Sequence, residues 1–259
     1  MLRKRTRRGR RCLKSTSQPC CTRPTTTLGP TDMRRLYHFL KAQYAVAAIK
    51  KRCLRVSRIE DLNDAFEFIG IALDDKRDRI HLSSYRRRLD LEQGIICMSE
   101  TWSKPQMWGH YGESFRGMVL GFDVSEGDFF KVRYRKTRPR LADLGLSSYA
   151  EIGPEHLKEF ARIKSDGWAY EDEWRWLLPL VNSEVIQGQT HYFQPFGPNL
   201  RLKEIIAGPK FRERSYEQMR EMVKGMGVEV MLARGDFAKF EVTRQRQLSL
   251  WPPVRPQTP

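Results

Sequence analysis

The sequence predicts an α+β fold, a single domain with a mixed, mostly antiparallel central sheet and flanking helices. Three observations favour this class. Short segments in which apolar and polar residues alternate recur along the chain, which is typical of strands. Fewer stretches have helical periodicity, and one of them separates two strand-like segments near the C-terminus, as in a βαβ unit. The 259 residues are enough to bury a large core.

Charge divides the chain into a basic tail and a domain. Residues 1–30 carry nine basic residues and no acidic one, and the other 38 basic residues face 31 acidic ones, so the tail supplies more than half of the net charge of +16. We expect a disordered basic tail at 1–32, one α+β domain at 33–248 and a Pro-rich tail at 249–259. The basic tail suits an arm that binds nucleic acid or anionic lipid, a targeting peptide or a solvated extension without a role. Met33 directly precedes the first strand-like segment and favours the last of these.

The first half of the domain is expected to contain three strands and three helices. The strands are predicted at residues 35–40, 53–57 and 94–99. The helices are predicted at 42–51, at about 75–91 and at 104–111, where Pro105 stands in the first turn. The Asn63-Asp64 dipeptide predicts a turn.

The second half begins with a predicted hairpin, in which strands at 117–124 and 129–135 flank a Ser-Glu-Gly-Asp turn. A helix is predicted at 154–165. Further strands are predicted at 168–180, 191–196 and 239–247. The predicted βαβ unit consists of strands at 202–207 and 228–233 around a helix at 214–224, which Gly225 and Gly227 end.

The cysteines indicate neither a disulfide framework nor a zinc site. There are five, at positions 12, 20, 21, 53 and 97, without a CxxC pair, and no two histidines have metal-ligand spacing. Cys53 and Cys97 flank apolar residues and are expected to be small buried side chains. No apolar run approaches the ~18 residues that span a bilayer. We therefore predict no metal, no membrane contact and a cytoplasmic location.

Two clusters in the first half combine polar and aromatic residues. One contains Asn63 and Asp64, whose side chains suit a turn or helix N-cap as well as a ligand. The other contains Trp108, His110 and Tyr111. His110 is the best general acid or base candidate, because imidazole titrates near neutrality. The structural alternative is that the two aromatic rings fill the core while His110 binds a backbone carbonyl.

A third cluster lies in the predicted strand at 168–180. Alternation along a strand would put Glu171, Glu173 and Arg175 on one face. This face would be either a row of structural ion pairs or a polar site for ribose hydroxyls. Glu173 is the more interesting acid, because large aromatic neighbours on both sides exclude water.

Together these clusters resemble a widespread bacterial family known as domain of unknown function 2971. Its ordered motifs are a Tyr-His strand, an Asn-Asp-x-Phe-Glu turn, a Cys-x-Ser strand, Met-Trp-x-x-Tyr, Gly-x-x-x-x-Phe-Asp, Lys…Trp-x-Tyr-Glu-x-Glu-x-Arg and Glu-Ile-Ile-x-Gly. They stand here, in the same order, at 37–38, 63–67, 97–99, 107–111, 117–123, Lys164 with 168–175, and 204–208. The chain departs from the pattern at Leu62 and Ala65, where the family favours Phe and Pro.

A second likeness is to folds that transfer ADP-ribose from NAD. Such folds often open with a strand ending in Tyr-His, continue to a strand bearing Ser or Tyr and place a Glu late in the chain, and Tyr37, His38, Ser57 and Glu173 resemble that order. The likeness implies that His38 binds the nicotinamide ribose, that Tyr37 or Tyr111 stacks on nicotinamide, and that Glu173 holds the ribose 2′-hydroxyl and stabilises the cationic centre. The expected site has His38, Glu173 and His110 as catalytic residues, and Tyr37, Ser57, Asn63, Trp108, Tyr111 and Arg175 as residues that bind NAD.

The leading hypothesis is therefore a cytoplasmic toxin-like or phage-defence effector that uses NAD as a substrate to modify protein or nucleic acid. One alternative is a nucleic-acid-binding or sensor module without catalysis, suggested by the basic charge with interleaved aromatic residues. A metal-dependent nuclease, with Asp64, Glu67, Glu171 and Glu173 as Mg²⁺ ligands, ranks third because no nuclease spacing ties these carboxylates together. No residue pattern points to a particular protein partner.

Overall fold

A large sheet forms the centre of the protein. The computed structural model describes residues 33–64, 66 and 70–255, so the predictions for the basic tail lie outside the described residues. The 11-stranded sheet is mixed and mostly antiparallel, with the order β13-β12-β11-β4-β1-β3-β2-β10-β9, and β8 pairs with β3 and β5. The α+β class with one central sheet and flanking helices is confirmed.

The bounds of the strands follow the apolar segments of the sequence. The strands of the large sheet are β1 (Met33–Leu40), β2 (Cys53–Arg58), β3 (Gln93–Ser99), β4 (Met118–Ser125), β5 (Phe130–Lys131), β8 (Glu173–Pro179), β9 (Ser183–Ile186), β10 (Gln189–Pro195), β11 (Leu200–Ala207), β12 (Glu229–Gly235) and β13 (Val242–Gln245). A separate parallel pair joins β6 (Arg133–Arg135) to β7 (Ile163–Ser165). Strands β11 and β12 are parallel and are connected through α5 (Tyr216–Met222), which confirms the βαβ unit.

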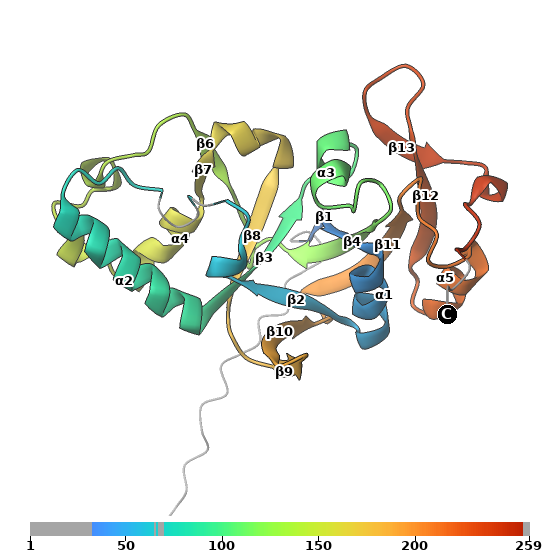
Figure 1. Cartoon of the computed structure of the whole chain (residues 1–259), viewed down its shortest axis with the longest axis horizontal. Coiled ribbons are helices and arrows are strands. Elements are labelled where there is room, and N and C mark those ends of the chain that lie inside the picture. The colour runs from blue at the N-terminus through green and yellow to red at the C-terminus, as the bar shows by residue number, and fades with distance from the viewer. Residues whose placement is uncertain (1–32, 65, 67–69, 256–259) are drawn as a thin grey trace, which may run out of the picture.

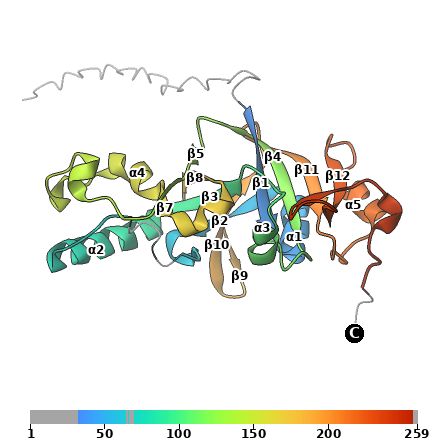
Figure 2. The ribbon, with the colours of Figure 1, turned by 90° about the horizontal axis from the view of Figure 1, so that it is seen from above.

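Helices cover both faces of the sheet (Figure 1). α1 (Ala42–Lys51) and α5 pack on one face, where Leu36, Leu120 and Phe122 belong to the largest apolar cluster. α3 (Pro105–His110) packs on the other face through Met107 and Trp108. α2 (Lys76–Glu92) and α4 (Leu157–Ala161) lie beyond one end of the sheet, opposite the end that carries α5 (Figure 2).

Local signals explain why the helices begin and end where predicted. The Asp75 side chain accepts a hydrogen bond from the Arg77 amide and caps α2. Pro105 occupies the first turn of α3, where its missing amide hydrogen costs nothing. Ser215 and Gln218 form a reciprocal capping box at the start of α5. Gly225 and Gly227 follow this helix with positive φ angles of 75° and 65°.

Several predicted elements of the second half are wrong in detail. The predicted hairpin does not form, because β4 pairs with β1 and β11, whereas β5 pairs with β8. The predicted helix at 154–165 is a 3₁₀ turn followed by the short α4 and by β7. The predicted strand at 168–180 begins as a 3₁₀ helix, η6 (Asp166–Glu171), and becomes β8 only after Asp172, whose φ angle is 44°. The edge strand β9 was not predicted, because its exposed residues have no core-facing pattern.

The loop between β12 and β13 shortens the last predicted strand and exposes two aromatic rings. Phe237 and Phe240 are 92% and 100% exposed. The Asp236 carboxylate accepts hydrogen bonds from the Ala238 and Lys239 amides, and the Asp236 amide donates to the Glu241 carbonyl at 2.8 Å. This loop projects from the body of the protein beside the β13 label in Figure 1.

The two cysteines in the described part of the chain are free and partly buried rather than fully buried. Burial raises the pKa of both the Cys53 and the Cys97 thiols. The described helices are all too short or too polar to cross a membrane.

Candidate functional site

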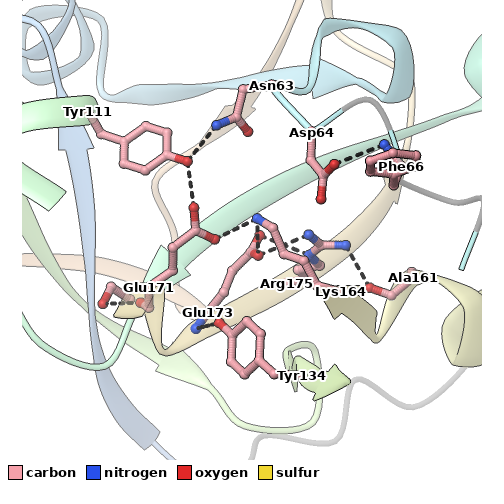
Figure 3. Close-up of polar contacts among 11 residues, drawn as sticks. Asn63, Asp64, Phe66, Tyr111, Tyr134, Ala161, Lys164, Glu171, Glu173 and Arg175 are labelled. Carbon is pink, nitrogen blue, oxygen red and sulfur yellow. Dashed lines mark hydrogen bonds and ion pairs between the residues drawn. The ribbon is translucent and has the colours of Figure 1, made fainter. Parts of the chain in front are cut away.

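Four charged side chains meet inside the protein and form what we call the buried charge cluster: Lys164, Glu171, Glu173 and Arg175. Each is at most 5% exposed. The Lys164 ammonium donates to Glu171 Oε2 at 2.5 Å and to Glu173 Oε2 at 3.0 Å. The Arg175 guanidinium donates to both Glu173 oxygens, at 2.8 and 2.9 Å, and to the Ala161 carbonyl at 2.8 Å (Figure 3). Two buried cations thus face two buried carboxylates.

The backbone around Asp172 brings the two carboxylates together. Glu173 and Arg175 are two residues apart on β8 and therefore share a face of the strand. Glu171 ends η6, and the left-handed conformation of Asp172 turns the chain between them. The Ser99 hydroxyl donates to the Glu171 carbonyl at 2.6 Å and fixes this turn against β3. The predicted shared face therefore arises from a turn followed by a strand.

The two carboxylates differ in their electrostatics. Burial by itself would raise the pKa of Glu173, but the charges of Arg175 and Lys164 outweigh it and lower this pKa to about 2. Burial and the negative charge of Glu173 raise the pKa of Glu171, and Lys164 only partly offsets them. Glu173 is thus a fixed anion, whereas Glu171 is the carboxyl group that accepts a proton more readily.

Tyr111 connects the buried charge cluster to the protein surface. Its hydroxyl donates to Glu171 Oε1 at 2.5 Å and accepts a hydrogen bond from Asn63 Nδ2 at 2.7 Å. Burial and the Glu171 carboxylate raise the pKa of Tyr111, so the phenol stays protonated as a donor. Asn63 itself is exposed. On the other side, the Tyr134 hydroxyl accepts a hydrogen bond from the Glu173 amide at 2.9 Å.

A cavity of ≈ 180 Å³ adjoins the cluster, and we call it the cation-rimmed cavity. Its lining residues come from the segment between β2 and α2, from the end of β6 and the residues that follow it, and from β7: Asp64, Phe66, Gly70, Arg135, Lys136, Thr137, Arg138, Ile163, Lys164 and Ser165. Arg135, Lys136 and Arg138 are exposed, and within the described part of the chain none of them pairs with a carboxylate. The Arg138 guanidinium lies 4.7 Å from the centre of the Phe66 ring, which is 57% exposed. Lys164 lines the cavity and also belongs to the cluster.

Four of the predicted site residues meet in this region: Asn63, Tyr111, Glu173 and Arg175. His110 lies nearby, at the end of α3, exposed and stacked on Tyr170 with ring centres 5.9 Å apart. Among the described residues no backbone carbonyl accepts a hydrogen bond from the His110 ring, although Trp108 and Tyr111 do pack in the apolar cluster under α3.

The expected meeting of His38 and Glu173 in one cavity is wrong. Tyr37 pairs with Ser99, and Ser99 pairs with Glu173, so these three side chains lie on one face of the sheet. His38 follows Tyr37 and therefore points to the opposite face. Its Nδ1 bonds to the Cys97 carbonyl at 2.8 Å, and burial lowers the pKa of this imidazole. His38 thus stabilises the sheet where β1 and β3 stop pairing.

The remaining predicted residues also lie apart from the cluster. Ser57 pairs with Ile95 of β3, which is four residues before Ser99, the residue that pairs with Tyr37 and Glu173. Trp108 is a fully buried residue of α3, and its Nε1 donates to the Trp102 carbonyl at 2.7 Å. Tyr37 is partly buried, and burial together with the nearby Glu204 carboxylate raises its pKa. Among the described residues, none of these three makes a hydrogen bond to a member of the buried charge cluster.

The carboxylates proposed as Mg²⁺ ligands have other partners. Both Glu171 and Glu173 bind the Lys164 ammonium, and an Asp64 oxygen accepts from the Phe66 amide at 2.9 Å. Glu67 lies outside the described residues. The described residues contain no group of three or more His, Cys, Asp or Glu side chains arranged to hold a metal ion.

Sequence reasoning gave no role to the cations of the cavity or to Tyr134. The signal for the cations was present, because residues 133–140 contain five basic residues and no acidic one. The signal for Lys164 was only its place in the family pattern, and nothing in the sequence indicated that it would be buried.

Comparisons with protein-family models, with curated proteins and with solved structures give no match to this chain.

Proposed function

We propose that this protein binds nucleic acid and holds the phosphate backbone at the cation-rimmed cavity. The observation that carries the proposal is the set of three exposed cations, Arg135, Lys136 and Arg138, that have no carboxylate partner within the described residues. Cations without internal partners are available to replace the counterions of a polyanion, and this replacement dominates the affinity of proteins for nucleic acid.

The neighbouring groups support the same ligand. Thr137 and Ser165 also line the cavity, and the hydroxyl groups of such residues commonly donate to phosphate oxygens. The partly exposed Phe66 ring offers an apolar surface beside the cations. The volume of ≈ 180 Å³ is smaller than the roughly 300–1,000 Å³ of pockets that enclose whole small ligands. It suits one phosphate group of a longer chain better than an enclosed dinucleotide.

The salt dependence of binding tests this proposal. We expect the double variant R135A/R138A to bind a labelled oligonucleotide more weakly. The plot of the logarithm of the binding constant against the logarithm of the salt concentration should also become less steep, its negative slope being smaller in magnitude by about 2, because each cation lost removes about one phosphate contact. Fluorescence anisotropy over a series of salt concentrations measures both quantities.

Arg133 provides the matched control. It lies on the same strand, is exposed and pairs with Glu159 at 3.1 Å. R133A removes one positive charge next to the cavity but no unpaired cation, so its slope should stay near that of the unchanged protein. Equal slopes for R135A/R138A and the unchanged protein would place any binding elsewhere in the chain.

ADP-ribosyl transfer through His38 and Glu173 lacks a supporting observation. Both Glu173 oxygens are held by Arg175 and Lys164, and His38 points to the opposite face of the sheet. We therefore expect no nicotinamide release when the purified protein is incubated with NAD and with protein and nucleic-acid acceptors. Chromatography of the products measures this, and nicotinamide released by the unchanged protein but not by H38A would restore the transferase hypothesis.

A further inference from the structure

A row of aromatic rings lies beside the cation-rimmed cavity. The Trp168 and Tyr170 ring centres are 6.0 Å apart, and those of Tyr170 and His110 are 5.9 Å apart, with 29° between the planes of the second pair. We call these three side chains the aromatic row. Trp168 and Tyr170 are partly buried, and His110 is exposed. The aromatic row therefore has two rings that are partly fixed by packing, Trp168 and Tyr170, and one solvent-accessible ring, His110.

The aromatic row is connected directly to the cavity. The Lys164 ammonium, which lines the cavity, lies 5.0 Å from the centre of the Trp168 ring. Ser165, another lining residue, immediately precedes η6, which carries Trp168 and Tyr170. η6 contacts β6 and β7, and it also contacts α3, which carries His110. Figure 1 shows β6, β7 and α3 along the same side of the protein.

We infer that the aromatic row stacks unpaired bases, so that the nucleic acid bound at the cation-rimmed cavity is single-stranded. This inference rests on the proposed function. Proteins that bind single-stranded nucleic acid usually combine cations, which contact the phosphate backbone, with aromatic rings on which the bases stack. Such stacking has little sequence preference, because every base has a π face. In a duplex the bases already stack on one another, so their faces are closed to the rings.

Packing alone is the competing explanation for the row, since Tyr170 also contacts the apolar cluster under α3. The two explanations differ in what a change at Tyr170 does to binding. If Tyr170 serves only packing, its replacement should lower the thermal stability and should weaken the binding of single strands and of duplex equally. A stacking role predicts a selective loss of affinity for single strands.

The test uses the full chain and labelled oligonucleotides of about 12 nucleotides, within the range that single-strand sites cover. Fluorescence anisotropy at fixed salt compares a uridine RNA strand, a thymidine DNA strand and a blunt DNA duplex. We expect both single strands to bind more tightly than the duplex. The difference between the RNA and DNA strands shows which sugar the site prefers.

The variants separate stacking from charge and from folding. Y170A should lose at least about fivefold in affinity for the single strands, because one stacked base contributes on the order of 1 kcal/mol or more. H110A should show a loss in the same direction. Y170F keeps the ring and should retain the affinity. Y44A removes a 53% exposed ring on α1 and is the matched control.

The outcomes distinguish this inference from the proposed function. If neither single strands nor duplex bind, the proposed function fails and this inference fails with it. If the duplex binds as tightly as the single strands, or if Y170A weakens both equally, nucleic-acid binding stands and the stacking role is overturned. A thermal melt of each variant identifies a loss of affinity that comes from unfolding.

Discussion

At the residue scale, Glu171 and Glu173 show how the surroundings assign different roles to identical side chains. Glu173 accepts hydrogen bonds from the cations Arg175 and Lys164, whose charges outweigh the effect of burial and lower its pKa to about 2. Glu171 accepts from Lys164 and from the neutral Tyr111 phenol, but burial and the negative charge of Glu173 outweigh these contacts and raise its pKa. The difference makes the two positions unequal in their contribution to stability.

Replacing Glu173 by Gln should therefore destabilise the protein strongly. The change removes a buried carboxylate that both Arg175 and Lys164 bind, and breaking a buried pair typically costs about 3 to 5 kcal/mol. E171Q should cost less, because burial and the negative charge of Glu173 already disfavour the ionised form of Glu171 and raise its pKa. Chemical denaturation at pH 7 measures both, and a larger loss for E171Q would contradict the assignment.

Glu173 also dominates the expected dependence of stability on acid pH. The ordinary pKa of Glu is 4.5, and in the folded protein that of Glu173 is about 2. Because the unfolded chain takes up the proton first, the stability that Glu173 contributes is present above about pH 4.5 and is lost as the pH falls towards 2. The E173Q variant should lose this part of the pH dependence, and its stability curve should be flatter in that window.

At the element scale, the turn at Asp172 decides whether the buried charge cluster forms. A non-glycine residue at a φ angle of 44° is uncommon, and Asp is among the residues that tolerate it. Its side chain also pairs with Lys104 at 2.5 Å near the surface. The turn between η6 and β8 therefore depends on the residue type at one position.

Replacing Asp172 by Val should separate Glu171 from Glu173. A β-branched residue is strained in this conformation, which costs on the order of 1 to 3 kcal/mol. D172N keeps a residue that adopts the conformation and loses only a part-exposed ion pair, so it should cost less than about 1 kcal/mol. Thermal unfolding of the two variants compares them, and equal melting temperatures would show that the turn does not need this backbone conformation.

The elements that the sequence predicts correctly are those with strong local signals. α1 follows from its apolar stripe, α2 from the Asp75 cap and β3 from a run of apolar residues. The predicted hairpin after β4 is wrong because its turn signal is local, whereas the pairing of β5 with β8 depends on residues more than 40 positions away. The strand predicted at 168–180 is wrong at its start because alternation does not reveal a left-handed residue.

The candidate site was predicted in part for the same reason. Asn63, Tyr111, Glu173 and Arg175 stand out through residue type and spacing, and the fold brings them together. The face to which His38 points depends on register between strands, which a single sequence does not specify. The burial of Lys164 depends on the parallel pairing of β6 with β7, which no local pattern indicates.

At the scale of the whole molecule, positive charge is present both in the segment 1–32 and at the cavity. The nine basic residues of the tail add to any affinity for a polyanion at low salt. The described domain begins with β1 at Met33, so removing residues 1–32 deletes no described element.

A chain that begins at Met33 should therefore fold and bind nucleic acid more weakly than the full chain, with a smaller salt slope. The further loss caused by R135A/R138A should persist in the shortened chain, because the cavity cations belong to the described domain. Anisotropy on four proteins, full and shortened, each with and without R135A/R138A, measures this. Complete loss of binding on shortening would assign the affinity to the tail.

The mutual dependence of Lys164, Glu171, Glu173 and Arg175 also limits how this sequence can diverge. Replacing one of the four removes a partner from a charge that stays buried, whereas joint replacement of all four by apolar side chains of similar size need not cost stability. Homologous chains should therefore vary at these four positions in concert, either keeping the whole ionic set or exchanging it together for a hydrocarbon interior.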